Sequence, residues 1–128
     1  WTEPKKLANQ KVFLDIDENV VVVGASRVEF VDEEGKHIKY FAGEKDSVAA
    51  RKNMLCVNPV ITSSVMFRES IFKGLGGFEN MYLAEDYDLW LRIGEKGKMH
   101  NFQEAFVNYR LPSYNRHKFK AFLKKQII

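Results

Sequence analysis

The chain has 128 residues, the length of one domain or a large part of one, so it cannot hold two complete domains. Apolar residues make up 45% of it and charged residues 29%, which is typical of a globular protein and excludes a disordered or collagen-like chain. The net charge of +3 is too small to indicate nucleic-acid binding. The single cysteine, Cys56, excludes an internal disulfide and a CxxC metal or redox site, and it fits a reducing, cytoplasmic setting.

The first residues predict a helix from Glu3 to Leu14, with Thr2 as its N-cap and Pro4 in its first turn. Because the chain starts at Trp1 rather than at an initiator methionine, we expect it to be a piece of a longer protein. The side chains whose spacing should place them on one face of this helix are Leu7, Ala8, Lys11 and Leu14.

The next segments predict strands. Val20–Ala25 is β-branched and apolar, which suits an interior strand covered on both faces and is too short to cross a bilayer. Residues 27–31 and 37–41 alternate around the turn at 32–35, which indicates a hairpin with one face in solvent. The expected cross-strand partners are Val28 and Phe30 on one strand and Ile38 and Tyr40 on the other.

Helices and strands alternate along the rest of the chain, which predicts an α/β fold with a sheet covered by helices. Glycines at 74, 76 and 77 should end a short helix and bring backbone segments close together; a phosphate cradle is a poorer explanation, because the glycines follow a helix and do not match GxGxxG. The other predicted elements are a helix from Asp46 or Ser47 to Leu55, a strand from Val60 to Phe67, a helical turn from Arg68 to Lys73, strands at 98–102 and 105–111, and a basic helix from about Asn115 to Ile128.

An acidic cluster opens the most informative helix. Glu85, Asp86 and Asp88 follow the loop at 78–83, and Asp88 lies one turn before Arg92. Acidic residues in a first turn complement the helix dipole, so a purely structural role stays open. The alternative is that one carboxylate acts as a general base. The stripe expected to face the core is Leu83, Tyr87, Trp90 and Leu91, with the helix ending at Gly94 or Gly97.

Other polar side chains carry weaker signals. His37, His100 and His117 have no metal-ligand spacing, so we expect surface residues rather than a metal site. Ser63 and Ser64 lack a nearby His and Asp pattern, which argues against a nucleophilic triad. The basic C-terminal segment could rest on an anionic membrane surface, or it could be a helix whose continuation packs elsewhere.

Four blocks, in this order and spacing, resemble the C-terminal half of family 2 glycosyltransferases with the GT-A fold. They are Asn58–Ser70, Leu75–Glu79, Glu85–Ile93 and Val107–Leu111. The opening, Trp1–Gln10, is similar to the segment that follows the family's metal-binding Asp-x-Asp motif. The resemblance covers nearly the whole chain but only about half of the family's catalytic domain.

The resemblance implies a partial GT-A fold, the nucleotide-diphospho-sugar transferase fold, with a mixed sheet flanked by helices and the N-terminal nucleotide-binding half missing. Residues 1–128 would be the acceptor-side part of one catalytic domain. The parent would be an inverting glycosyltransferase of the hexosyltransferase type, moving a sugar from a nucleotide-diphosphate donor to an acceptor hydroxyl in polysaccharide or glycolipid biosynthesis. The fragment alone should be inactive. The alternative is a non-catalytic carbohydrate-binding or oligomerisation module that keeps the fold.

The resemblance also implies roles for individual residues. Asp86 corresponds to the general base, and the substrate-binding residues would be Glu85, Gly76, Gly77, Phe78 and Trp90. A divalent metal ion, Mg²⁺ or Mn²⁺, is expected on ligands that lie mostly outside this chain. Many relatives have a histidine where this chain has Pro112, and His117 is a poor substitute, so we assign no metal ligand. We expect no nucleic-acid partner and a cytoplasmic location with peripheral membrane contact through the basic helix. We also expect a homodimer, or another form of protection, at the exposed sheet edge.

Overall fold

The computed structural model describes residues 1–42, 52, 54–56, 58 and 60–112. Most of the predicted helix that ends at Leu55 lies outside these residues. The whole predicted basic helix, with His117, lies outside them too.

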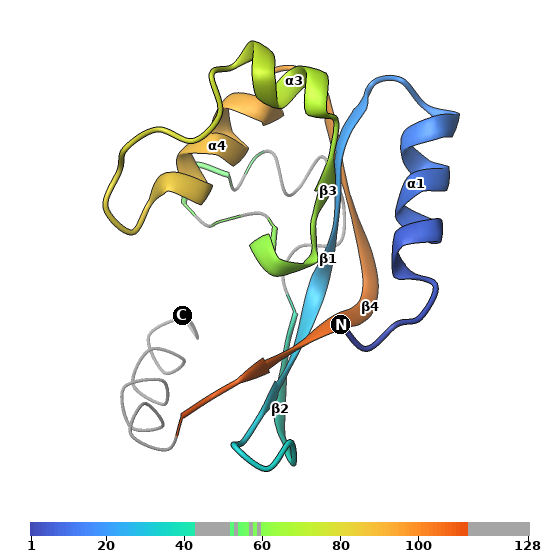
Figure 1. The fold of residues 1–128 in the computed structure, drawn as a ribbon, viewed down its shortest axis with the longest axis vertical. Helices are drawn as coiled ribbons and strands as arrows, with labels where there is room; N and C mark the ends of the chain where they lie inside the picture. The colour runs from blue at the N-terminus through green and yellow to red at the C-terminus, as the bar shows by residue number, and fades with distance from the viewer. Residues whose placement is uncertain (43–51, 53, 57, 59, 113–128) are drawn as a thin grey trace.

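A four-stranded mixed sheet forms the centre of the protein (Figure 1). Strand β1 (Val20–Val31) pairs in parallel with β4 (Lys98–Arg110) along its length. It pairs in antiparallel fashion with β2 (His37–Ala42) over its second half and with β3 (Met66–Phe67) over its first. The predicted α/β class and the interior strand at Val20–Ala25 are therefore confirmed. The two predicted strands at 98–102 and 105–111 are one strand, because β4 stays paired with β1 through local shifts in register.

Helices lie on both sides of the sheet (Figure 1). Helix α1 (Lys6–Ile16) packs on one side, and α3 (Glu69–Gly74) and α4 (Glu85–Gly94) lie on the other. The cluster between α4 and the sheet contains Val21, Val22, Leu89, Trp90, Ile93 and Met99. A smaller cluster under α1 contains Leu14, Val20 and Val23.

Helix α1 begins three residues later than predicted, and Thr2 is not its N-cap. Thr2 instead donates from its backbone N–H to the Phe106 carbonyl (3.0 Å) and from its hydroxyl to the Ala105 carbonyl (3.1 Å). These bonds tie the start of the chain to β4, and Lys5 takes the N-cap position without a side-chain cap.

The buried face of α1 matches the predicted one only at Leu14. Leu7 is 48% exposed, and Lys6 and Gln10 are buried instead. Gln10 Nε2 donates to the carbonyls of Val23 and Ser64, both at 2.7 Å, and Lys6 Nζ donates to Gln10 Oε1 at 2.8 Å. Satisfied hydrogen bonds allow these polar groups to be buried. Burial lowers the pKa of Lys6 below its ordinary value.

The predicted hairpin is confirmed, but its register is shifted by one residue. Val28 lies opposite Phe41 and Phe30 opposite Lys39, with an irregularity between Phe30 and Val31. A bulge of this kind changes which side chains face each other across the pair. Ile38 and Tyr40 do not face Val28 and Phe30 and remain 39% and 46% exposed.

The predicted strand from Val60 to Phe67 is wrong for most of its length. Thr62–Ser64 form a single 3-10 turn, η1, and only Met66–Phe67 pair with β1. The Ser64 hydroxyl accepts a hydrogen bond from the Ala25 N–H (2.9 Å) and donates to the Ile61 carbonyl (2.7 Å). A side chain thus makes the contact to β1 that a strand would make with its backbone. The turn leaves Thr62 exposed beside α4.

Candidate active site

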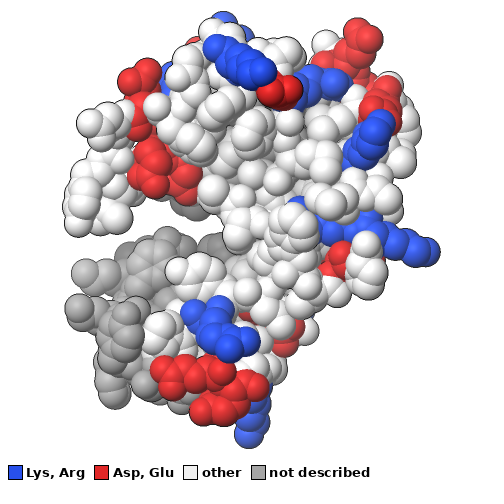
Figure 2. Space-filling model, viewed as in Figure 1, with Lys and Arg blue, Asp and Glu red and all other residues white. Residues whose placement is uncertain are grey.

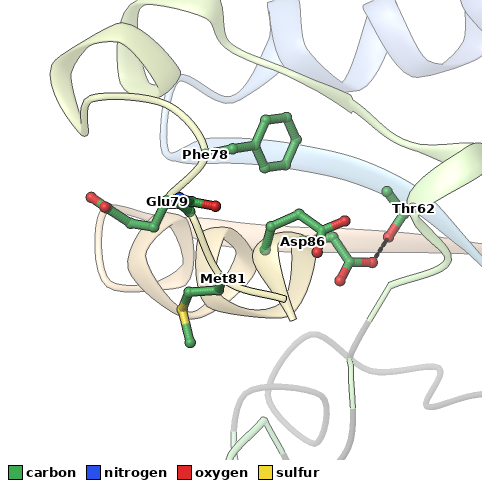
Figure 3. Close-up of a pocket in the computed structure, with 7 residues that line it drawn as sticks. Thr62, Phe78, Glu79, Met81 and Asp86 are labelled. Atoms are coloured by element: carbon green, nitrogen blue, oxygen red, sulfur yellow. Dashed lines mark hydrogen bonds between the residues drawn. The ribbon is translucent and has the colours of Figure 1, made fainter. Parts of the chain in front are cut away.

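A pocket of about 510 Å³ lies where η1, the loop after α3 and the first turn of α4 meet (Figure 3). The predicted helix at this position is confirmed as α4, although Leu83 lies before it, is 81% exposed and has a left-handed backbone (φ 57°). The face of α4 that packs on the sheet carries Leu89, Trp90 and Ile93. Two of the three acidic residues in its first turn, Glu85 and Asp86, line the pocket. The residues that line it are Thr62, Phe78, Glu79, Asn80, Met81, Glu85 and Asp86.

The glycine-rich loop is anchored to α4. Gly76 and Gly77 both have positive φ angles (80° and 79°), which suit the turn that ends α3. Arg92 pairs with Asp88 (2.6 Å) and donates to the carbonyls of Leu75 (3.0 Å) and Gly77 (2.9 Å). The predicted Asp88–Arg92 pair is therefore confirmed, and its structural effect is to hold the loop against the helix.

Asp86 is half-buried and lies within a short chain of hydrogen bonds. Its Oδ2 accepts from the Thr62 hydroxyl at 2.5 Å, and its Oδ1 accepts from the Tyr87 N–H at 2.7 Å. Thr62 Oγ1 in turn accepts from the indole Nε1 of Trp90 at 3.3 Å. In Figure 3 the side chains of Asp86 and Thr62 point toward each other at the edge of the pocket. The carboxylate is therefore held in place and still borders open space.

The pocket is acidic. Glu79, Glu85 and Asp86 line it, and no lysine or arginine is among its described lining residues. In the space-filling view, acidic side chains gather over α4 and the loop before it (Figure 2). Nowhere in the described parts of the chain do three His, Cys, Asp or Glu side chains form a group that could hold a metal ion. The acidic pocket suits proton acceptance and hydrogen bonding to hydroxyl groups.

Three of the six site residues implied by the resemblance line the pocket, namely Phe78, Glu85 and Asp86. Gly76 and Gly77 lie in the loop that leads to it, and Trp90 is 1% exposed behind Thr62. The prediction that Trp90 faces the core is confirmed. Sequence reasoning missed four lining residues, Thr62, Glu79, Asn80 and Met81. The available signal for Thr62 is that three consecutive polar residues, Thr62–Ser64, interrupt the segment predicted as a strand.

The described histidines lie elsewhere. His37 contacts the Glu29 carboxylate at 2.9 Å on the exposed hairpin. His100 stacks on Phe13 with ring centroids 4.1 Å apart, and burial lowers its pKa. The Ser64 hydroxyl is engaged in the contact between η1 and β1. None of these groups lines the pocket.

A second pocket, of about 370 Å³, lies beside Ser63 of η1. It is lined by Trp1, Ser63, Val107, Asn108, Tyr109 and Arg110. Thr62 lines the first pocket and Ser63 the second, so one short turn contributes to both. Trp1 is held there by a hydrogen bond from its indole to the Ser63 carbonyl (3.2 Å). The fold thus brings the opening segment and the 107–111 block together, although they are a hundred residues apart.

Two curated proteins are similar to this chain over most of its length. An uncharacterised glycosyltransferase of Methanocaldococcus jannaschii is 30% identical over 125 residues, which cover 96% of this chain and 42% of that protein. The Bacillus subtilis protein EpsE is 32% identical over 111 residues, covering 84% of this chain and 38% of that protein. Both relatives are named as glycosyltransferases.

The chain spans about two fifths of the length of these relatives. No protein-family profile matches the sequence. Within the described residues, no helix has the length and apolar character needed to span a bilayer.

Proposed function

We propose that this chain is the acceptor-side part of an inverting glycosyltransferase of family 2 with the GT-A fold, acting as a hexosyltransferase. The observation that carries the proposal is the carboxylate of Asp86, fixed by Thr62 at the edge of an open acidic pocket. The names of the two relatives support a glycosyltransferase in general terms. The four sequence blocks supply the finer assignment.

In the proposed reaction, Asp86 accepts the proton of the acceptor hydroxyl as the hydroxyl oxygen attacks the anomeric carbon of the donor sugar. A new carbon–oxygen bond forms on one face of the sugar. The bond between the anomeric carbon and the diphosphate oxygen breaks on the opposite face, and the nucleoside diphosphate leaves with the bonding electron pair. Attack from the opposite face inverts the anomeric configuration. General base catalysis of this kind accelerates reactions by about 10² to 10⁴-fold.

The other lining residues suit a polyhydroxylated acceptor. Glu79, Glu85 and Asn80 offer carboxylate and amide groups that hydrogen-bond to hydroxyls. Phe78 is 50% exposed, so its ring can pack on the apolar face of a sugar. Gly76 and Gly77 shape the loop that presents these groups, and Trp90 supports Thr62 from behind.

The Mg²⁺ or Mn²⁺ ion expected from the resemblance would supply positive charge to the leaving diphosphate. The described residues do not fit such an ion, because no group of three suitable ligands exists among them. Its ligands would therefore belong to other parts of the protein, and the proton transfer to Asp86 does not depend on them.

The setting of the reaction is also part of the proposal. Polysaccharide or glycolipid biosynthesis at the cytoplasmic side of a membrane fits an acceptor-side pocket of this chemistry. Among the described strands β4 pairs only with β1, so its other edge can accept a strand from the rest of the protein or from a second copy.

The test is sugar transfer by the full-length protein that contains this chain. A panel of nucleotide-diphosphate sugars would be incubated with saccharide acceptors, and the anomeric configuration of each product would be determined by NMR. We expect at least one donor to give a product of inverted configuration. Binding of saccharides without any transfer would favour a non-catalytic module, and a retained configuration would contradict the inverting mechanism.

A further inference from the structure

The hydroxyl of Thr62 sits between a buried donor and the proposed base. The indole N–H of Trp90 can only donate, so at 3.3 Å Thr62 Oγ1 must accept from it. The single hydroxyl proton of Thr62 is then available for Asp86 Oδ2, at 2.5 Å. The direction of both hydrogen bonds follows from the chemistry of the tryptophan.

The core fixes this hydroxyl in space. Trp90 is 1% exposed and packs in the cluster between α4 and the sheet. On the other side, η1 is tied to β1 because the Ser64 hydroxyl accepts a hydrogen bond from the Ala25 N–H, and the same hydroxyl closes the turn by donating to the Ile61 carbonyl. The Thr62 hydroxyl is therefore fixed by Trp90 on one side and by the anchored backbone of η1 on the other.

The charges around Asp86 favour a hydrogen bond that holds its carboxylate in one orientation. Glu79 and Glu85 line the same pocket, and like charges favour a separation of the three carboxylates. The cation on α4, Arg92, is engaged with Asp88 and the glycine loop. The Thr62 hydroxyl and the Tyr87 N–H together occupy two of the roughly four acceptor positions of the Asp86 carboxylate.

We propose that Thr62 is a positioning residue, which holds the Asp86 carboxylate in the orientation that receives the acceptor proton. This inference rests on the proposed function, since it assumes that Asp86 is the base. Thr62 does not touch the reacting atoms. It acts through Asp86, with Trp90 setting the direction of its hydroxyl.

The test compares Thr62→Val with Thr62→Ser in the full-length protein. Valine keeps the shape and removes the hydroxyl, whereas serine keeps the hydroxyl. A hydrogen bond to a charged group is lost in Thr62→Val, so we expect kcat to fall about tenfold or more with little change in KM. Thr62→Ser should restore most of the turnover. Full turnover in Thr62→Val would overturn the inference.

A double variant separates positioning from folding, because Thr62→Val also leaves the buried Trp90 N–H without its partner. If Thr62 acts through Asp86, adding Thr62→Val to Asp86→Asn should cause no further fall in kcat. Losses that multiply in the double variant would assign Thr62 a general structural role and contradict the proposal.

A spectroscopic readout keeps the inference testable without activity. The side-chain carboxyl ¹³C resonance of Asp86 should move in Thr62→Val and stay near its original position in Thr62→Ser. An unchanged resonance in Thr62→Val would overturn the inference whatever the turnover. If the resonance moves but Asp86→Asn keeps full turnover, the proposed function fails while the contact between Thr62 and Asp86 stands.

Discussion

Arg92 on α4 donates a hydrogen bond of 2.9 Å to the backbone carbonyl of Gly77, in the loop that follows α3. The same guanidinium bonds to the Leu75 carbonyl and to Asp88. The helix that carries Asp86 and the loop that carries Phe78 are therefore joined by one side chain. Changes at Arg92 should alter both the stability of the fold and the shape of the pocket.

We predict that Arg92→Lys destabilises the protein by about 1–3 kcal/mol, because an ammonium group cannot reproduce the planar fork that reaches two carbonyls and a carboxylate. The measurement is the free energy of unfolding in denaturant. The matched control is Lys73→Gln, which breaks an exposed ion pair with Glu69 and should change stability by less than about 1 kcal/mol. Equal effects of the two substitutions would show that the anchoring contacts contribute little.

Gly97 lies directly before β4, where the chain passes close to the Asn19 backbone and the Val21 side chain. A Cβ at this position would stand 2.4 Å from the Asn19 carbonyl oxygen and 2.7 Å from Val21 Cγ1. We predict that Gly97→Ala destabilises the protein by about 1–3 kcal/mol, since backbone must move to relieve the overlap.

Gly74→Ala is the control for this substitution. Gly74 ends α3, and a Cβ there would meet no atom within 4 Å. Its replacement should leave stability unchanged or raise it by up to about 1 kcal/mol. Thermal unfolding of both variants tests the pair, and a Gly97→Ala protein as stable as Gly74→Ala would contradict the close approach seen here.

His100 predicts a pH dependence of stability. Its ring stacks on Phe13, and burial lowers its pKa in the folded protein. The unfolded chain then binds a proton more readily between the lowered pKa and the ordinary value of about 6.5, so the free energy of unfolding should decrease as pH falls through this range. His100→Phe keeps a stacked ring and removes the titrating group. We expect this variant to lose that part of the decrease, as measured by denaturant unfolding between about pH 7 and pH 5. An identical decrease in both proteins would contradict the assignment.

Long, regular patterns in the sequence predicted the fold well. The apolar run at Val20–Ala25 lies in the central strand, and the amphipathic pattern after residue 84 forms α4. The hairpin was also recognisable from its turn. These features depend on local residue types, which the sequence displays directly.

The errors came from side chains that replace backbone or apolar contacts. Ser64 bonds to the backbone of Ala25, so a polar turn stands where an apolar strand was predicted. Lys6 donates to Gln10, and Gln10 donates to two backbone carbonyls, so a polar face of α1 is buried. Such long-range hydrogen bonds have no periodic signature in the sequence.

The candidate site was only partly predictable for the same reason. The resemblance pointed to Asp86, Glu85 and Phe78, which do line one pocket. Thr62 joins them only because η1 turns out of the sheet edge, 24 residues earlier in the chain than its partner Asp86. The contact between Thr62 and Asp86 depends on the tertiary fold and has no local signature in the sequence.

The most direct test of the proposed function is the turnover of Asp86→Asn in the full-length protein, measured with the donor and acceptor identified by the transfer assay. Asparagine keeps the size and can still accept from Thr62, but it cannot take a proton. We predict that kcat falls by about 10² or more. Glu95→Gln, at the far end of α4 and outside the pocket, serves as the control and should keep its turnover. Near-normal turnover in Asp86→Asn would remove this residue from the role of general base.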